Sequence, residues 1–278
     1  MSGARGGSPV PELVRVERRG AVALLVFDDP ERRNAMTEAM GHALASAVAG
    51  LAADASVRAA VLTGAGSAFS AGGDLDMIEE RSRAGREEPG PAGRAHSRAF
   101  MRDFYRLFLS VRELPCPSIA AIQGPAIGAG LAVALACDLR VAARDTRLGA
   151  NFVRLGIHPG MGSSWTLPRL VGPAHACDLL LTGRLVDGAE AERIGMVNRV
   201  AERDDVVPQA LAWADEIARC APVAVRGAKR ALGLALDASL DEQLDFEAEQ
   251  QALCYETADL AEGLLAARER RAPRFSGR

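Results

Sequence analysis

The chain has 278 residues and a formal net charge of −3, and 49% of its residues are hydrophobic. That hydrophobic fraction is ordinary for a globular protein and argues against wholesale disorder. The small negative charge argues against a general attraction to nucleic acid or to acidic membranes. The length allows one large domain, or a domain with an appended helical region.

Predicted strands and helices alternate over the first two thirds of the chain. Arg19-Gly20 is a turn between two strands, and Thr37 can cap a helix that runs to about Ala53. Periodicity and short apolar runs give the other elements. The expected strands are 13–18, 21–27, 59–62, 118–122, 139–142, 147–149 and 197–200, and the further helices are 100–111, 129–136, 163–170, 173–181 and 186–194.

Residues 81–97 are charged and rich in glycine and proline, so we expect a mobile loop that could act as a lid over a site. From 206 to 271 the pattern is helical, with breaks near Pro222, Asp237 and Thr257. Strand–helix alternation followed by helices alone predicts an α/β core with a helical C-terminal appendage.

The cysteines, the first ten residues and the run 118–137 bear on the cellular compartment and on whether the chain spans a membrane. The five cysteines are scattered and form no C-x-x-C pair, so we expect five buried thiols in a reducing, cytoplasmic protein. Residues 1–10 have no apolar stretch of the signal-peptide kind, and we expect a flexible tail there. The nearly uncharged run 118–137 is built from alanine and glycine, which favours a buried core segment over a membrane span.

The segment AFSAGGDL at 68–75 is the first candidate for chemistry. A strand leads into Ala71-Gly72-Gly73, and Asp74 begins a helical pattern. The glycines permit positive φ and a close approach to a ligand, and free N–H groups at such a turn can donate to a developing oxyanion. The alternative interpretation is a tight turn with Asp74 as a helix cap.

A second segment, Gln123 to Leu131, repeats this arrangement. A buried strand ends in a turn of small residues that opens a helix, whose N-terminus would offer the N–H of Ala129 or Gly130. The alternative is close helix–strand packing, which also needs small residues. An oxyanion hole needs two converging donors, so the two segments together indicate more than either does alone.

The chain resembles the enoyl-CoA hydratase/isomerase (crotonase) family over nearly its whole length. The motifs that carry the resemblance, in the family's order and spacing, are Arg32-Arg33-Asn34-Ala35-Met36, AFSAGGDL at 68–75, PCPSIAAIQGPAIGAGLAVALACDLRVA at 115–142, LGIHPGMGSSWTLPRLVG at 155–172, LLLTGRLVDGAEAERIGMVNRV at 179–200 and the ending at 271–277.

The resemblance implies a crotonase-like spiral of ββα units with a C-terminal helical trimerisation region, assembled as a homo-oligomeric trimer or hexamer. On this basis the expected units are the tail 1–10, a spiral core with the acyl-CoA site at 11–204, and the C-terminal helical region 205–278. It implies no nucleic-acid partner and no membrane span.

The resemblance also implies that a coenzyme A thioester is bound as substrate, with no prosthetic group and no metal. The thioester oxygen would lie between the backbone N–H groups of Gly73 and Ala129. The residues expected to contact the substrate or CoA are Ala68, Phe69, Ala71, Gly72, Asp74, Leu75, Gly128, Ala132 and Phe152. Lys229 is a candidate for the CoA phosphates of a neighbouring subunit.

One departure from the family concerns catalysis. The family's hydratases carry two glutamates, at the positions that Ala132 and Phe152 hold here. Between 114 and 177 the acidic residues are Asp138 and Asp145, and Asp138 belongs to the family's common Cys-Asp pair, which we interpret as structural. Because a general acid or base typically contributes about 10²–10⁴-fold in rate, we predict poor hydration of an enoyl-CoA.

Other groups could substitute for the missing pair. His158 follows Phe152 in a turn and could titrate near neutral pH, although a turn histidine bonded to backbone is the alternative. Arg154 and Asn151 are candidates for ligand contacts or for plain surface and loop roles. The sequence thus predicts an acyl-CoA-processing enzyme with an altered reaction, such as isomerisation, thioester hydrolysis or C–C cleavage. The alternatives are a non-catalytic acyl-CoA-binding or scaffold protein and a helical trimerisation module.

Overall fold

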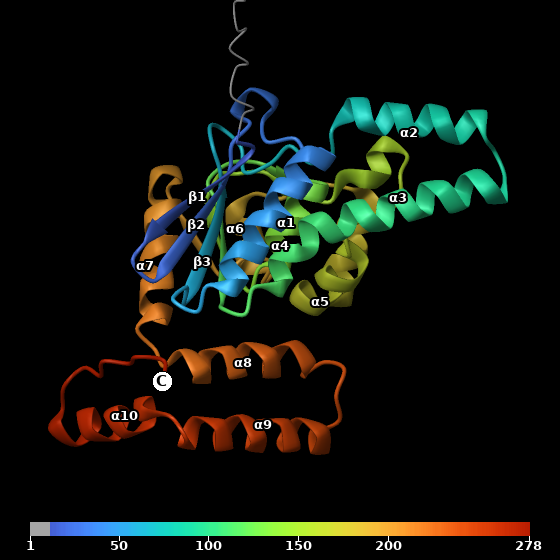
Figure 1. Ribbon diagram of the computed structural model, residues 1–278. Coiled ribbons are helices and arrows are strands. Elements are labelled where there is room, and N and C mark those ends of the chain that lie inside the picture. The colour runs from blue at the N-terminus through green and yellow to red at the C-terminus, as the bar shows by residue number, and fades with distance from the viewer. Residues whose placement is uncertain (1–11) are drawn as a thin grey trace, which may run out of the picture.

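A six-stranded sheet forms the centre of the molecule in the computed structural model, which describes residues 12–278 (Figure 1). The expected tail at 1–10 lies outside the described residues. The first two strands are antiparallel and every other neighbouring pair is parallel. In spatial order the strands are β1 (Val14–Arg19), β2 (Val22–Phe27), β3 (Ala59–Gly64), β4 (Ser118–Ile122), β6 (Leu139–Ala143) and β8 (Arg199–Ala201).

Both faces of this sheet are covered. In β2, Ala23, Leu25 and Phe27 face one hydrophobic cluster with helix α1 (Glu38–Ala53), while the alternate residues face a second cluster with helix α7 (Val206–Ala218). Strands buried on both faces read as continuous apolar runs, which is why the sequence located them to within one or two residues.

A smaller sheet lies beside the large one and brings the two glycine-rich segments together. Strands β5 (Ala126–Ile127) and β7 (Leu148–Gly149) pair in parallel. Isolated bridges extend this sheet on both sides, from Ser70 to Ala126 and from Leu148 to Val186. The loop after β3 therefore lies directly against the loop after β4.

The expectation of a mobile loop at 81–97 is wrong. The segment belongs to two helices, α2 (Leu75–Glu87) and α3 (Pro91–Leu109), joined by a short turn (Figure 1). Pro91 occupies the first turn of α3, where its missing N–H and fixed φ are compatible with a helix. The charged residues are good helix formers, and they leave α2 without a buried residue. The composition of residues 81–97, taken alone, therefore resembled that of a loop.

The described residues also form the short 3-10 helices η1 (Pro30–Arg32), η2 (Ser110–Glu113), η3 (Asn151–Leu155) and η4 (Arg203–Asp205).

The segment after the small sheet is helical for most of its length. Helix α5 (Ser163–Thr182) joins the two helices expected at 163–170 and 173–181 across a kink at Gly172, and α6 (Gly188–Arg193) is capped by the Asp187 side chain.

Three C-terminal helices form a layer apart from the sheet (Figure 1). They are α8 (Pro222–Leu234), α9 (Leu240–Tyr255) and α10 (Ala258–Glu269), separated near the predicted breaks. Among residues 12–278, no helix is both long and apolar enough to cross a membrane.

The five cysteines do not share one environment. Cys116 and Cys137 are buried as expected, but Cys177 and Cys220 are exposed and Cys254 is partly exposed, so the expectation of five buried thiols is wrong. Cys177 and Cys220 lie on or just after helices with solvent-facing sides, where a small residue carries no packing requirement.

Candidate oxyanion site

The loop that carries the first candidate donor is held by buried polar groups. The Asn34 side chain is fully buried, and its Nδ2 donates to the carbonyl oxygens of Ala65 and Ala68, each at 2.9 Å. The Met36 N–H donates to the Gly72 oxygen at 2.8 Å. In a trans peptide the C=O and the following N–H point in opposite directions, so the Gly73 N–H points away from Met36.

Gly72 itself occupies a position that only glycine fits. Its φ is +92°, a conformation that side-chain-bearing residues rarely adopt. A Cβ at this position would also lie 2.4 Å from the Ile127 carbonyl oxygen. The predicted positive φ is therefore confirmed at Gly72, and the close approach seen here is to the Ile127 backbone, while the approach to a ligand stays a prediction.

The second candidate donor stands at a helix N-terminus. Gly128 has φ 54° and ψ −118°, and it is the N-cap residue of α4 (Ala129–Ala136). Its carbonyl oxygen accepts from the Ala132 N–H at 3.1 Å, which is the first hydrogen bond of the helix. The Ala129 N–H consequently points out of the helix end, where the helix dipole favours negative charge.

The two turns converge on one another. A Cβ at Gly72 would lie 3.5 Å from the Ala129 nitrogen, and the Ile127 N–H donates to the Ser70 oxygen at 3.1 Å. Within residues 12–278, neither the Gly73 N–H nor the Ala129 N–H donates to a protein acceptor. Two free donors from adjacent turns can hydrogen-bond one carbonyl oxygen and stabilise negative charge on it.

Apolar side chains border the second turn. Phe152, in η3, is buried, and its Cε1 lies 3.8 Å from the place of a Cβ at Gly128. Ala132 is buried one turn into α4 from the Ala129 donor. The Asn151 Oδ1 lies 3.5 Å from the same Cβ position, so η3 presents one amide and one aromatic ring to this turn.

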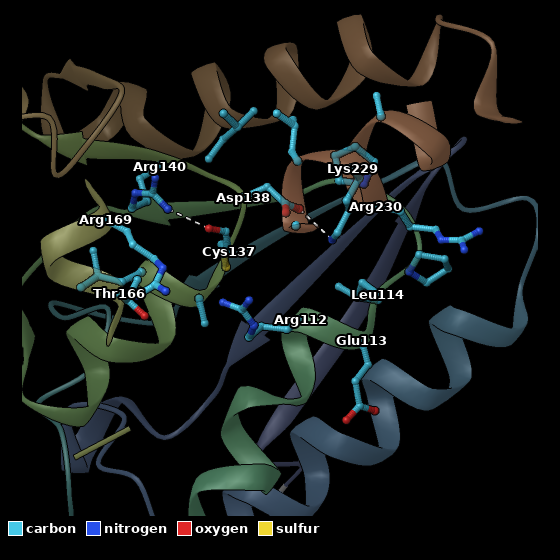
Figure 2. A pocket seen from close by; sticks show the side chains of 18 of the residues that line it. Arg112, Glu113, Leu114, Cys137, Asp138, Arg140, Thr166, Arg169, Lys229 and Arg230 are labelled. Carbon is cyan, nitrogen blue, oxygen red and sulfur yellow. Dashed lines mark hydrogen bonds and ion pairs between the residues drawn. The ribbon is translucent and has the colours of Figure 1, made fainter. Parts of the chain in front are cut away.

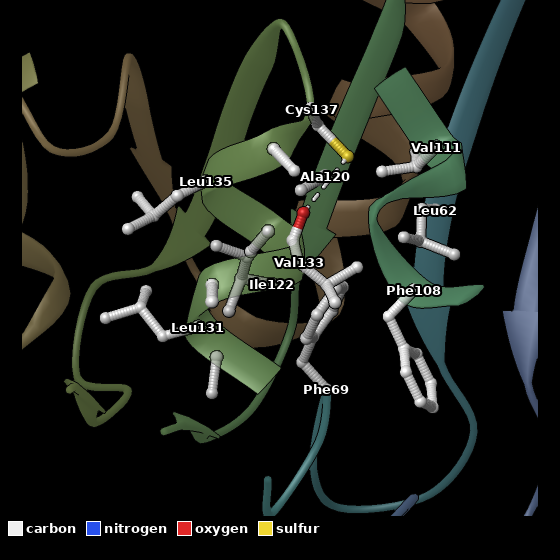
Figure 3. Packing of buried hydrophobic residues seen from close by; sticks show 14 of the residues in the cluster. Leu62, Phe69, Phe108, Val111, Ala120, Ile122, Leu131, Val133, Leu135 and Cys137 are labelled. Atoms are coloured by element: carbon white, nitrogen blue, oxygen red, sulfur yellow. Dashed lines mark hydrogen bonds between the residues drawn. The ribbon is translucent and has the colours of Figure 1, made fainter. Parts of the chain in front are cut away.

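The remaining residues predicted around the first turn differ in what they can reach. Asp74 caps α2 by accepting from the Met77 N–H at 2.9 Å and forms an ion pair with Arg32, so the capping interpretation is confirmed. Phe69 is fully buried and packs edge-on against Phe27 at 5.8 Å, with its ring among core residues in Figure 3. Ala68 is buried, whereas Ala71 and Leu75 are exposed.

His158 is exposed, and its Nδ1 lies 2.8 Å from the carbonyl oxygen of Pro159. This is the geometry of the turn histidine considered as its alternative role. Arg154 donates from Nε to the Thr182 carbonyl oxygen at 2.9 Å, which ties η3 to the end of α5.

Sequence reasoning missed three residues near the site. Asn34 has φ 54°, a conformation that asparagine tolerates better than most residues. It lies in one of the motifs that carry the resemblance, and that was the available signal. Ser70 is fully buried between the two turns. Tyr105 of α3 directs its hydroxyl at Gly160, where a Cβ would lie 2.5 Å away, and burial raises the pKa of this hydroxyl.

A cavity of about 860 Å³ lies at the opposite end of α4, between the core and α8 (Figure 2). Of the residues predicted to contact the substrate or CoA, Lys229 lines it and the others do not. At its wall Lys229 pairs with Asp138 at 2.8 Å and donates to the Cys116 carbonyl oxygen at 2.9 Å. Asp138 also accepts from the Ser118 N–H at 2.7 Å, so its structural role is confirmed. The ammonium group of Lys229 is thus engaged within its own chain.

Residues 12–278 contain no group of three or more His, Cys, Asp or Glu side chains arranged to hold a metal ion.

Comparisons with known proteins agree on one family. The family model described as "Enoyl-CoA hydratase/isomerase" matches residues 17–278. A Thermus thermophilus protein, provisionally named an enoyl-CoA hydratase, is 42% identical over 263 residues, covering 95% of this chain and 100% of the relative. A crotonyl-CoA hydratase of Syntrophomonas wolfei is 32% identical over 265 residues, covering 95% and 98%. The solved enoyl-CoA hydratase of Bacillus anthracis has a TM-score of 0.85 and 32% identity, covering 96% and 100%.

Proposed function

We propose that this chain, which belongs to the enoyl-CoA hydratase/isomerase family, binds an acyl-CoA thioester and polarises its carbonyl with the N–H groups of Gly73 and Ala129. The family and the solved relatives confirm the crotonase-like fold and an acyl-CoA-processing role. The observation that carries the proposal is the close approach of the Gly72 turn to the Ala129 nitrogen, with no protein acceptor for the Gly73 or Ala129 N–H in the described chain.

The proposed chemistry follows from where charge would develop. Attack on the thioester, or removal of a proton beside it, moves negative charge onto the carbonyl oxygen. Two fixed N–H donors stabilise that charge without reorganising, and one such donor is typically worth about 10²–10³ in turnover. The donors at Gly73 and Ala129 are main-chain groups whose peptide carbonyls are already anchored, so they are held in place before substrate arrives.

We propose further that this chain hydrates enoyl-CoA poorly. Ala132 and Phe152 stand where the resemblance places the two hydratase glutamates, and neither side chain can move a proton. His158 is the candidate replacement acid/base, and its exposed position would give it access to water. Ala68, Ala71, Gly72, Asp74 and Leu75 would form the CoA side of the site, with Phe69 contributing through its backbone.

The test is a titration of the protein with CoA thioesters of different acyl chains, followed by assays of every binder for turnover. We expect binding, with slow or absent hydration of crotonyl-CoA. Vigorous hydration of crotonyl-CoA would contradict the assigned lack of acid and base. Failure to bind any CoA thioester would defeat the whole proposal.

The alternative function is a non-catalytic acyl-CoA-binding or scaffold protein. It is favoured by the apolar side chains around the second turn. Comparing the wild type with His158→Ala separates the two. Turnover that is lost in the variant, with binding retained, supports a histidine-assisted enzyme, and tight binding without turnover in either protein supports the scaffold.

We also propose that the protein is a homo-oligomer, either a trimer or a hexamer. Large apolar side chains are exposed on α8, on α9 and in the segment between them, including Leu232, Leu236 and Leu240, each at least 68% exposed. Such a surface is unusual for a monomer. In the proposed division, 11–204 holds the site and 205–278 serves assembly, although α7 of that region packs on the sheet. Light scattering on the purified protein tests this, and a monomer at micromolar concentration would contradict it.

The proposed compartment is the cytoplasm. It rests on the free thiols at Cys177 and Cys220, which lie exposed and unpaired in the described chain. Fractionation of the source cells, with detection of the protein by antibody, tests the assignment.

A further inference from the structure

Ser70 is the point at which the two donor turns are joined. It is fully buried, and its backbone N–H donates to the Pro125 oxygen at 3.1 Å, while its own carbonyl oxygen accepts from the Ile127 N–H at 3.1 Å. These two bonds hold the segment that leads into Gly128 and Ala129. The backbone of Ser70 is therefore tied to the second donor.

The side chain of Ser70 is tied to the first donor. Its hydroxyl donates to the Asn34 carbonyl oxygen at 2.7 Å and accepts from the Gly72 N–H at 3.1 Å. The hydroxyl thus donates its proton to the main chain of the segment before α1 and accepts from the main chain of the loop that ends in Gly73, so it ties the two segments together.

Gly72 needs such an anchor because it immediately precedes a donor and is the most flexible residue type. Its carbonyl is fixed from one side by the Met36 N–H at 2.8 Å. Its own N–H is fixed from the other side by Ser70 at 3.1 Å. With both peptide planes held, the φ and ψ of Gly72 are set, and so is the direction of the Gly73 N–H.

The packing around Ser70 leaves little room for another arrangement. A Cβ at Gly130, in the first turn of α4, would lie 2.8 Å from the Ser70 Cβ and 2.9 Å from its Oγ. The helix that carries the second donor thus lies directly against the side chain that anchors the first one. A displacement of Ser70 would be transmitted to both turns.

We propose that Ser70 is a positioning residue that sets the distance and direction between the Gly73 and Ala129 N–H groups, and thereby the polarisation of the bound thioester carbonyl. This inference rests on the proposed function of those two donors. Ser70 itself does not touch the substrate, and its effect acts through Gly72.

The experiment uses Ser70→Ala, Ser70→Cys and a matched control, Ser110→Ala. Ser110 is also buried, and its hydroxyl donates to the Leu107 carbonyl oxygen at 2.6 Å, but it lies in η2, outside both turns. The probe is crotonyl-CoA labelled with ¹³C at the thioester carbonyl. Its carbonyl stretching frequency, read by infrared difference spectroscopy, reports the two hydrogen bonds directly, and melting temperatures report folding.

Wild type and Ser110→Ala are expected to shift the carbonyl band to lower frequency by the same amount. Ser70→Ala should bind crotonyl-CoA with little change in affinity but with a smaller shift, and Ser70→Cys, which keeps a weak donor, should lie between them. For any thioester that is turned over, kcat should fall about 10- to 100-fold in Ser70→Ala, because misplacement by about 1 Å has that effect, with KM nearly unchanged.

A full band shift and full kcat in Ser70→Ala would overturn the role of Ser70 and leave the proposed function standing. The absence of any band shift in the wild type would instead refute the proposed function of the donors. If Ser70→Ala does not fold, Ser70→Cys decides alone: a wild-type band shift and kcat in that variant overturn the inference, and a reduction in both supports it.

Discussion

The ring of Phe152 lies beside Gly128, with its Cε1 3.8 Å from the position of a Cβ there, so an aromatic side chain borders the turn that offers the Ala129 N–H. Under the proposed function, Phe152 and Ala132 hold the positions at which the family's hydratases carry their two glutamates. The most direct test is therefore to introduce glutamate at both positions.

The double variant Ala132→Glu, Phe152→Glu is expected to gain hydration of crotonyl-CoA, by more than about 10-fold over wild type, since a general acid or base typically contributes about 10²–10⁴-fold. The assay is loss of the enoyl absorbance. The control is Ala132→Gln, Phe152→Gln, which has the same shape without proton transfer and should stay at the wild-type rate. Equal rates in the two double variants would contradict the assignment of these positions.

Replacing Gly72 by alanine should destabilise the protein by at least about 2 kcal/mol, because a left-handed conformation alone costs a side chain about 1–2 kcal/mol. The added Cβ would also meet the Ile127 oxygen at 2.4 Å. Chemical denaturation measures the change. The control Gly85→Ala lies within α2 with no atom within 4 Å of its Cβ, and it should instead stabilise the protein by about 0.5–1 kcal/mol.

The fold was largely predictable because its strands are apolar runs and its glycine-rich turns follow them. The glycines at 72 and 128 gave correct turn positions from local sequence. The end of α2 and the first half of α3 were missed because Gly85, Gly90 and Pro91 suggest a loop, although Pro91 fits a first helical turn; the start of α2 after Asp74 and the second half of α3 were predicted. Residues buried by distant contacts, such as Asn34, could not be identified, because local periodicity does not specify partners more than thirty residues away.

The candidate site shows the same limit. The residue pattern predicted the two turns, and the resemblance assigned the donors to Gly73 and Ala129, but the approach of the Gly72 turn to the Ala129 nitrogen depends on the small sheet that pairs Ser70 with Ala126. His158 has a residue type suited to catalysis, yet its hydrogen bond is to the neighbouring Pro159 backbone. The type of a residue predicts which chemistry its side chain can perform, but the tertiary arrangement decides which groups that side chain contacts.

Lys229→Met should loosen the C-terminal layer from the core. The lysine side chain is 15% exposed, pairs with Asp138 at 2.8 Å and donates to the carbonyl oxygen of the buried Cys116 at 2.9 Å, so Lys229→Met removes the donor of a buried main-chain acceptor. We expect a loss of about 1–3 kcal/mol in unfolding free energy, as for a buried polar group that loses its partner. The control Arg106→Gln removes a fully surface pair with Asp103 and should cost less than about 1 kcal/mol. Equal effects of the two variants would show that the Lys229 pair is not special.

Acid should release the C-terminal segment that follows α10. The Arg271 guanidinium, followed by the Arg274 N–H, lowers the pKa of Glu262 from 4.5 to about 2. A carboxyl whose pKa is lowered in the folded state stabilises that state above its ordinary pKa, and the contribution is lost as pH falls from about 4.5 towards 2. The protection factor of the Arg274 amide, which compares its exchange with that of an unstructured chain at the same pH, should therefore fall in that window.

The matched variant for this window is Glu262→Gln. It removes the ionisable group, so the Arg274 amide should already be less protected at neutral pH, and its protection factor should not change further between pH 4.5 and 2. A wild-type protection factor that stays constant over this range would contradict the role of the Glu262 carboxylate.

Both donor peptides are fixed through their carbonyl oxygens, by Met36 at the first turn and by Ala132 at the second. The Ala132 contact is made by its backbone N–H, whatever side chain the residue carries. Under the proposed function, the side chain at position 132, and with it the reaction, could therefore change while both donor peptides stay fixed. Binding of the thioester and its chemistry would in this sense be separately mutable.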